Sequence, residues 1–338
     1  MTFMIKSVQF KNFKALRDTT LPLERFTLIV GPNGSGKSTA LQALRAISNA
    51  GEIDFNRVIT TGQRFSAENF VEITLHLGWP YEGSAYGIRW SEAGVSGPHK
   101  GPLAAMDQEA RNLLSRDLER IRIYSFDAQA IAAPVPLVPN VELTPNGHNL
   151  AGVLDQLRDQ DHERFEALNE ALGLWLPEFD RILFETPQPG TRSILLRTRR
   201  GQHKIAATDL SQGSLMALAM LTLAYLPNPP SVVCLEEPDR GIHPRLLRDV
   251  QEALYRLSFP ESYSEEREPV QVIATTHSPY LLDLYRDHPE QVVIANKTEE
   301  GTKFERLSEQ PYIEEILRDS HLGDVWYTGV LGGVPAHL

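Results

Sequence analysis

The sequence predicts an α/β fold with a mostly parallel central sheet, an antiparallel side sheet and a short helical lid. Strands and helices alternate along most of the chain, which is the order that a parallel sheet requires. A glycine-rich loop, Gly31 to Thr39, joins the buried strand Phe26–Val30 to an amphipathic helix. Residues 70–77 alternate as a strand with one buried face does, and 84–90 are expected to pair with them in the side sheet.

Hydrophobic periodicity places the other elements. Apolar runs and alternation predict further strands at 3–13, 121–126, 181–186, 193–198, 231–235 and 270–275. Apolar residues spaced by three and four predict helices at 36–47, 107–120, 149–172, 213–226 and 244–257. Glycine, proline or charged residues predict irregular segments at 91–105, 131–148 and 260–269.

Length and composition bound the class of protein. The 338 residues, 41% of them apolar, predict one large domain over residues 1–338. The formal net charge of −11 differs from the basic surplus of a general nucleic-acid binder. No apolar stretch reaches the about 18 residues that a transmembrane helix needs, and no secretory signal begins the chain. Since Cys234 is the single cysteine, we expect a cytoplasmic protein without an internal disulfide.

One segment concentrates basic residues despite the acidic total. It runs from Arg192 to Lys204 and also holds Arg197, Arg199 and Arg200. These side chains could contact DNA. The alternative is a solvated hairpin that turns at Gly201, with the apolar residues on either side as its strands.

The loop from Gly31 to Thr39 carries the most specific chemistry. It matches G-x-x-x-x-G-K-[ST] between a buried strand and a helix, the context of a phosphate-binding loop. Glycines let successive backbone N–H groups face phosphate oxygens, and the helix N-terminus adds partial positive charge. Lys37 is expected to neutralise the β- and γ-phosphates of ATP, and Ser38 to bind Mg²⁺. The predicted nucleotide-binding residues of this loop are Asn33, Gly34, Ser35, Gly36, Lys37, Ser38 and Thr39.

Polar residues also follow two other predicted strands. Glu236 and Glu237 end the strand at 231–235, at the edge where ligands of open α/β sheets bind. Glu236 suits the outer shell of Mg²⁺, and Glu237 suits the polarisation of a water for attack on the γ-phosphate. His277 follows the strand at 270–275 and could donate to the γ-phosphate. Lys37, Glu237 and His277 are therefore the predicted catalytic residues.

A further candidate site precedes the helix at 213–226. Ser211 is expected to cap this helix. The same hydroxyl, the Gly213 backbone and the helix N-terminus together make an anion site, so the two roles are compatible.

These motifs, in this order, resemble the ABC ATPase superfamily, and more narrowly its SMC, RecF and OLD-type members. Gly31 to Thr39 is similar to the Walker A motif, and Leu210 to Ser214 is similar to the signature motif. Glu236 and Glu237 look like Walker B with its catalytic glutamate. His277 looks like the switch histidine of the family.

The match also has a D-loop candidate and two departures. Asp239 to Pro244 falls where the family has its D-loop. The signature has Gln212 where glycine is usual, and Walker B has Glu236 where aspartate is usual. The first departure puts the contact of the signature with nucleotide in doubt, whereas the second keeps a carboxylate.

The resemblance implies a P-loop NTPase of the ABC-ATPase type that forms an ATP-dependent homodimer. Two protomers would enclose two ATP molecules, with the signature of one at the γ-phosphate bound by the other. Residues 83–120 would be an elaboration, and 149–180 a short lid in place of the SMC coiled coil. The glutamine that binds the metal would be Gln129, with Gln63 as the second candidate. OLD nucleases carry a TOPRIM nuclease domain after the switch histidine, and too few residues follow His277 for one here.

Three functions remain open. The first is a switch for DNA, or for a separately encoded nuclease or effector, in DNA repair or anti-phage defence, with no membrane contact. The second is the nucleotide-binding subunit of a membrane transporter, and the third is a scaffold that binds ATP only to dimerise. The SMC-like opening, Ile5 to Lys14, and the continuation His277 to Pro279 favour the first. The apolar tail 326–335 either packs on the core or docks a partner.

Overall fold

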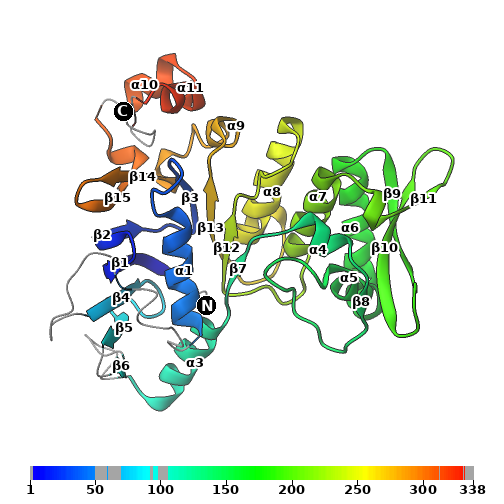
Figure 1. Cartoon of the computed structure of the whole chain (residues 1–338), viewed down its shortest axis with the longest axis horizontal. Helices are drawn as coiled ribbons and strands as arrows, with labels where there is room; N and C mark the ends of the chain where they lie inside the picture. Colours follow the sequence, from blue (N-terminus) through cyan, green and yellow to red (C-terminus); the bar gives the residue numbers. More distant parts are fainter. Residues whose placement is uncertain are drawn as a thin grey trace. The chain divides into compact units, whose positions relative to one another are not determined.

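The computed structural model describes residues 3–49, 59, 70–91, 94–97, 106–311, 313–329 and 331. The chain divides into two compact units, and each combines segments that are distant in the sequence (Figure 1). The first unit comprises Met1–Ile123, Pro230–Leu235 and Ser258–Leu338, and the second comprises Tyr124–Pro229 and Glu236–Leu257.

A six-stranded sheet forms the centre of the first unit, in the order β15-β14-β3-β13-β12-β7. Its strands are β3 (Phe26–Val30), β7 (Ile121–Tyr124), β12 (Val232–Glu236), β13 (Gln271–Thr276), β14 (Val292–Thr298) and β15 (Gly301–Arg306). β3 runs parallel to β13 and to β14, and β15 pairs antiparallel with β14. Every residue of β3 and β13 is buried, as in parallel sheets with both faces covered. The predicted central sheet is confirmed, and the hairpin β14–β15 adds two strands that the sequence analysis did not predict.

The antiparallel side sheet of the first unit is also confirmed, in the order β2-β1-β4-β5-β6. Its strands are β1 (Ile5–Phe13), β2 (Leu16–Pro22), β4 (Phe70–Leu77), β5 (Ala85–Ser91) and β6 (Gly94–Ser96). β6 lies in a segment that was predicted as a loop. β4 is buried over five consecutive residues rather than on one face. The reason is that Arg89 pairs with Glu72 on the polar face and stacks over the Phe70 ring at 4.2 Å, which covers that face.

One apolar cluster joins the two sheets of the first unit through α1 (Lys37–Ser48). Leu41 and Leu44 of α1 share it with Phe10 of β1, Ile73 of β4 and Ile273 of β13. This packing fixes the first turn of α1, and hence the phosphate loop, against the central sheet. The other helices of the unit are α3 (Gln108–Glu119), α9 (Pro279–Asp283), α10 (Ile313–Asp319), α11 (Leu322–Tyr327) and the 3₁₀ turns η4 (Pro260–Tyr263), η5 (Pro289–Gln291) and η6 (Leu307–Glu309).

The second unit packs helices against a small antiparallel sheet. Its helices are α4 (Ala128–Ala132), α5 (Leu150–Gln160), α6 (His162–Trp175), α7 (Gln212–Ala224) and α8 (Leu247–Ser258), with the 3₁₀ turns η2 (Ala207–Asp209) and η3 (Pro244–Leu246). Its strands are β8 (Val135–Pro136), β9 (Phe179–Glu185), β10 (Thr191–Thr198) and β11 (Lys204–Ala206). β10 pairs antiparallel with each of the other three. α7 is buried from residue 214 to 224, as a helix that is apolar all round is expected to be.

The predicted lid differs from the structure in one respect. The sequence analysis predicted a single helix over 149–172, whereas the chain breaks it at Asp161 into α5 and α6. The Asp161 carboxylate accepts a hydrogen bond from the Arg164 backbone N–H at 3.1 Å, so it caps α6 instead of continuing α5. The treatment of 83–120 as an elaboration and of 149–180 as a lid of one ATPase domain stays a prediction.

Candidate functional site

The phosphate loop, Gly31 to Thr39, connects β3 to α1. Gly34 and Gly36 have φ values of +77° and +94°, which glycine adopts without steric cost. The Ser35 N–H donates to the Pro32 carbonyl at 3.2 Å and closes the turn. Gly36 is the N-cap residue of α1, so the N–H groups of the first helical turn, which an α-helix cannot pair within itself, lie at the loop. An anion held by this loop would face backbone donors and the positive end of the helix dipole.

Lys37 folds back over the phosphate loop. Its side chain is 5% exposed, and Nζ donates to the Gly31 carbonyl at 2.7 Å and to the Pro32 carbonyl at 2.9 Å. The same nitrogen lies 3.4 Å from Nδ1 of His277, a residue 240 positions later in the chain. The structure therefore brings two of the three predicted catalytic residues together at the predicted phosphate loop.

Strand register explains this contact. β3 and β13 are parallel neighbours, and Val30 pairs with Thr276 at their carboxyl ends. Gly31 begins the phosphate loop directly after β3, and His277 comes directly after β13. Ser278 then caps α9 through its hydroxyl, at 3.3 Å from the Leu281 N–H, which turns the chain after His277.

The other predicted residues of the loop differ in exposure. Asn33, Gly34 and Ser38 are exposed, Thr39 is half-buried, and Ser35 and Gly36 are buried. The Ser35 side chain is fully buried, and within the described part of the chain its hydroxyl has no hydrogen-bond partner. A buried hydroxyl without a hydrogen-bond partner lowers the stability of the protein unless a ligand supplies that partner. The loop therefore carries a polar group that suits an oxygen-rich ligand.

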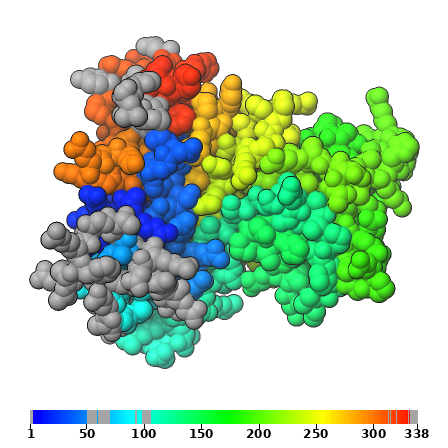
Figure 2. All heavy atoms as spheres, in the orientation of Figure 1, coloured from blue at the N-terminus to red at the C-terminus, as the bar shows by residue number. Residues whose placement is uncertain are grey.

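The hairpin β14–β15 flanks the phosphate loop and was missed by the sequence analysis. A Cβ atom on Gly31 would lie 2.5 Å from the carbonyl oxygen of Ala295 in β14. A Cβ atom on Gly36 would lie 2.6 Å from Oγ1 of Thr302 in β15. The space-filling view shows this orange segment against the blue N-terminal strands, and the Thr302 N–H donates to the Ala15 carbonyl at 3.2 Å (Figure 2). The apolar run at 292–295 was the sequence signal for β14.

The Walker B segment ends the strand β12. Its four residues from Val232 to Leu235 are buried, whereas Glu236 and Glu237 are half-buried. Glu237 has a φ of +48°, in the left-handed region that a glutamate rarely adopts. Its carbonyl accepts from the Arg240 N–H at 2.9 Å, which fixes the following turn. Such a backbone costs about 1–2 kcal/mol per residue, and strain of this kind clusters at functional sites.

The signature segment lies in the second unit, at the start of α7. The Ser211 hydroxyl accepts from the Ser214 N–H at 3.1 Å and lies 2.8 Å from the Ser214 hydroxyl, so the predicted cap is present. Gln212, the residue that departs from the usual signature, has its side chain against Gly241. A Cβ atom on Gly241 would lie 2.8 Å from its Cδ, and one on Gly213 would lie 2.8 Å from the Gly241 carbonyl. The signature and the D-loop candidate are thus packed together.

The glutamine-loop prediction falls on α4. Gln129 is exposed near the start of this short helix, which Asp127 caps through the Ala130 N–H at 2.7 Å. Gln63, the second candidate, lies outside the described residues. The metal-binding role of Gln129 stays a prediction.

Two protein-family models match the chain over the segments that carry these motifs. Residues 100–283 match a family described as "AAA domain, putative AbiEii toxin, Type IV TA system", over more than half of the chain. The chain belongs to this AAA family. Residues 4–121 match a second model, "AAA ATPase domain". The phosphate loop of this AAA protein lies in the second match, and its signature, Walker B and His277 lie in the first.

Similar proteins confirm the predicted resemblance. The AAA protein is 24% identical to an OLD nuclease of Thermus scotoductus, in a match that covers 88% of this chain and 65% of the nuclease. It therefore spans less than two thirds of that relative. A solved SMC head bound to the C-winged helix domain of ScpA has 15% identity and a TM-score of 0.61, and covers 92% of this chain and 99% of its own. The SMC head domain from Thermotoga maritima has 17% identity and a TM-score of 0.49, covering 90% and 99%. The first of these structures shows that the AAA protein has the SMC-head type of fold, as expected.

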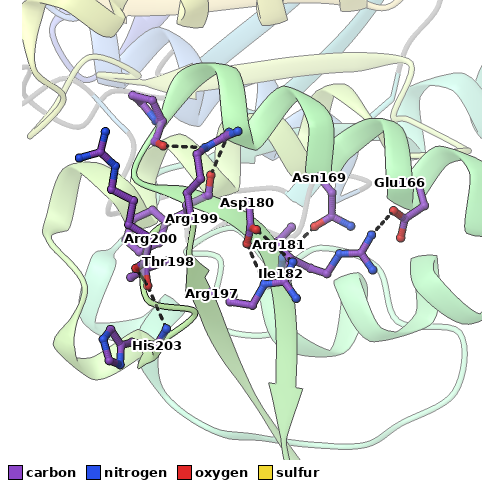
Figure 3. Close-up of polar contacts among 12 residues, drawn as sticks. Glu166, Asn169, Asp180, Arg181, Ile182, Arg197, Thr198, Arg199, Arg200 and His203 are labelled. Carbon is purple, nitrogen blue, oxygen red and sulfur yellow. Dashed lines mark hydrogen bonds and ion pairs between the residues drawn. The ribbon is translucent and has the colours of Figure 1, made fainter.

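The basic segment of the AAA protein is a hairpin with bonds to its own unit (Figure 3). Arg197 donates to both carboxylate oxygens of Asp180, at 2.8 and 3.0 Å. This guanidinium holds the pKa of Asp180 below its usual range through the hydrogen bond. Arg192 pairs with Asp155 at 2.9 Å. The turn contains Gly201, with a φ of +79°, as the hairpin interpretation predicts.

The other three basic residues of the segment differ in whether they are bonded within the unit. Arg199 donates to the carbonyls of Pro177 at 3.0 Å and Gly173 at 3.2 Å, near the end of α6. Arg200 and Lys204 are exposed at the hairpin end. Two of the five cations are therefore available to an external anion, which favours the hairpin interpretation over a DNA-contact surface.

No helix within the described ranges is both long and apolar enough to cross a bilayer.

Proposed function

We propose that this chain binds ATP with Mg²⁺ and hydrolyses it, as a dimer in which two protomers enclose two ATP molecules. The observation that carries the proposal is the 3.4 Å approach of Lys37 Nζ to His277 Nδ1 over the phosphate loop. Two side chains suited to a γ-phosphate reach the same loop from the ends of neighbouring parallel strands. Membership of the AAA family supports this assignment.

The loop residues would hold the phosphates. Backbone N–H groups of the loop and the N-terminus of α1 would supply donors, and the Lys37 ammonium would supply positive charge. Lys37 would exchange its two carbonyl partners for phosphate oxygens, which are the stronger acceptors. The buried Ser35 hydroxyl provides one further donor inside the loop.

The oxygen donors of the chain fit Mg²⁺. Ser38 is an exposed residue in the first turn of α1, and Glu236 is a half-buried residue at the end of β12. Mg²⁺ prefers such oxygens and is commonly held by one or two protein groups together with phosphates. The described residues contain no cluster of three His, Cys, Asp or Glu side chains that could hold a metal by themselves. Bound there, Mg²⁺ would neutralise charge on the β- and γ-phosphates, and Gln129 would add an amide oxygen.

Glu237 would act as the general base. It follows β12, the strand next to β13 in the central sheet. Its carboxylate would take a proton from a water whose oxygen bonds to the γ-phosphorus, while the bond from that phosphorus to the bridging oxygen breaks. ADP and phosphate are the products. His277 would donate to a γ-phosphate oxygen and so report whether ATP or ADP is bound.

The second protomer would complete the site with Ser211 and Gly213. The α7 N-terminus, capped by Ser211, has the donors of an anion site. The Ser211 hydroxyl accepts from the Ser214 N–H and also lies 2.8 Å from the Ser214 hydroxyl, so its proton would turn from Ser214 to a phosphate oxygen of the partner's ATP.

Phosphate release and sizing test the proposal together. We expect steady-state turnover in the wild type and a loss of roughly 10²–10⁴-fold in Glu237→Gln, which cannot take the proton. The same variant should elute as a dimer with ATP and as a smaller species without it. A wild type without turnover that still dimerises with ATP would show the scaffold function instead. Turnover with only monomer in the presence of ATP would contradict the dimer.

We also propose that ATP binding switches the contact of this protein with DNA or a separately encoded effector, in DNA repair or anti-phage defence in the cytoplasm. Similarity to an OLD nuclease over 88% of the chain supports a role near nucleic acid. The SMC head with ScpA shows that a protein of this fold takes a protein partner. Binding of duplex DNA, and recovery of partners from the source cells, should depend on ATP in Glu237→Gln. Binding that is equal with ATP and ADP would contradict a switch.

A further inference from the structure

Thr302 lies against the phosphate loop from the side of the β14–β15 hairpin. Its Oγ1 is 2.6 Å from the position that a Cβ atom on Gly36 would take, and its Cγ2 is 3.1 Å from it. The hydroxyl oxygen is the nearest heavy atom to that position, and Cδ2 of Leu16 follows at 3.0 Å. The Thr302 side chain is 5% exposed, and among the residues that the structure describes its hydroxyl has no hydrogen-bond partner.

We propose that Thr302 is a nucleotide contact, and that its hydroxyl donates to a phosphate oxygen of the nucleotide bound at the phosphate loop. The inference rests on the ATP binding proposed above. It adds a residue from outside the recognised motifs and assigns a role to the β14–β15 hairpin.

The position of the hydroxyl is fixed by the backbone around it. The Thr302 N–H donates to the Ala15 carbonyl at 3.2 Å, and β15 pairs with β14 along its whole length. β14 in turn pairs with β3, the strand that leads into the phosphate loop. Loop and hairpin therefore belong to one sheet, and the hydroxyl keeps its place beside Gly36 while its proton rotates freely.

An unpartnered hydroxyl at this place has a clear chemical use. Burying a hydroxyl without a hydrogen bond is unfavourable, so such groups are rare in folded proteins. The N-terminus of α1 gathers donors for an anion, and a second hydroxyl without a partner, that of Ser35, lies in the same loop. A phosphate oxygen would accept a hydrogen bond from the Thr302 hydroxyl. Hydrogen bonds to a charged acceptor are among the stronger ones.

The test compares nucleotide affinity with the stability of the nucleotide-free protein. Thr302→Val keeps the shape of the side chain and removes the hydroxyl. We expect its affinity for a non-hydrolysable ATP analogue with Mg²⁺, measured by calorimetry, to fall about tenfold or more. Its melting temperature without nucleotide should stay equal or rise, because an unpaired buried hydroxyl has been removed.

Two matched variants complete the experiment. Thr302→Ser keeps a hydroxyl and should retain most of the affinity. Thr298→Val removes a hydroxyl from the same hairpin, one that already donates to the Gly301 carbonyl at 2.9 Å, and should leave the affinity unchanged. If Thr302→Val does not fold, Thr302→Ala serves in its place, since it removes the hydroxyl without adding bulk.

The outcomes separate this proposal from the one on which it rests. Unchanged affinity in Thr302→Val would overturn it, and so would a weaker affinity that comes with a lower melting temperature without nucleotide. A wild type that binds no ATP analogue would contradict the proposed function itself. Weaker binding with unimpaired stability, restored by Thr302→Ser, would establish the contact.

Discussion

The phosphate loop and the basic hairpin β10–β11 both contain polar groups, but these groups differ in whether they already have hydrogen-bond partners. In the hairpin, Arg197 is bonded to Asp180, and Arg199 is bonded to backbone carbonyls. Beside the phosphate loop, the hydroxyls of Ser35 and Thr302 are buried and lack partners within the described residues. The hairpin has more charge, most of it bonded within its own unit, whereas the loop region has buried hydroxyls to which a ligand could bond.

This difference shows why a count of basic residues is a poor guide to a binding site. A guanidinium that is bonded to a carboxylate of its own unit offers little net charge to a ligand, because the pair is nearly neutral at a distance. A buried donor without a partner, by contrast, gains a full hydrogen bond when a ligand arrives. This difference supports the proposal that the loop binds the ligand and that most of the hairpin has a structural role.

The largest expected effect contrasts the two sites directly. Lys37→Ala should reduce ATP turnover by roughly 10²–10³-fold, because it removes a positive charge at the γ-phosphate. Arg197→Ala removes a positive charge from the hairpin and should leave the turnover rate unchanged. Phosphate release at saturating ATP measures both. Equal losses in the two variants would break the comparison, since they would make the hairpin part of the reaction.

Glycine substitutions in the phosphate loop should have a smaller effect, a loss of thermal stability whose size depends on the position. Gly36→Ala forces a side chain into a φ of +94° and places its Cβ 2.6 Å from Thr302 Oγ1. Gly34→Ala meets only the backbone cost of about 1–2 kcal/mol, at a φ of +77°, because nothing lies within 4 Å of its Cβ. Thermal unfolding without nucleotide should therefore show a larger loss for Gly36→Ala. Equal losses of melting temperature in the two variants would mean that the β14–β15 hairpin does not restrict the space beside Gly36.

Ligand stabilisation gives a third test, with an effect of about 2.7 kcal/mol at a hundredfold excess of ATP over its Kd. We expect ATP with Mg²⁺ to raise the melting temperature of the wild type and to have little effect on Lys37→Ala. Thr302→Val should show a reduced shift at the same ATP concentration. A full shift in Lys37→Ala would place the nucleotide elsewhere in the protein.

The smallest expected effect is that of hairpin substitutions on the salt dependence of DNA binding. If the hairpin contacted DNA, replacing both Arg200 and Lys204 by alanine would lower the salt slope of binding by about two. We expect no such change, because the other three cations of the segment are bonded within the unit and these two alone are too few for a DNA-contact surface. Binding of a short duplex over a range of salt concentrations measures the slope. A slope reduced by two would restore the DNA-contact interpretation of the basic segment.

The sequence was most informative where function depends on local order along the chain. The phosphate loop follows from one motif between a strand and a helix, and the meeting of Lys37 with His277 follows from parallel strands that end at the same edge. The cap at Ser211 is equally local. Each of these depends on neighbours in sequence or on a general property of parallel sheets.

The features that the sequence analysis missed depend on contacts across the fold. Nothing near Thr302 in sequence indicates that it lies beside Gly36, because a strand pairing brings them together. The polar face of β4 is covered by Arg89 from the next strand. The break at Asp161 reflects a choice between continuing a helix and capping the next one, which propensity alone does not decide.

The contact of Gln212 with Gly241 has a consequence for exchanging parts between relatives. The glutamine side chain fills the space that any side chain at 241 would need, and the Gly241 carbonyl fills the space beside Gly213. We therefore expect the exchange of either loop alone for a homologous sequence to disturb the packing of the other. A chimera that imports the common glycine at 212 would leave a gap over Gly241, and one that imports a bulkier D-loop would displace the glutamine. The two loops, nearly thirty positions apart, have to be transplanted as a pair.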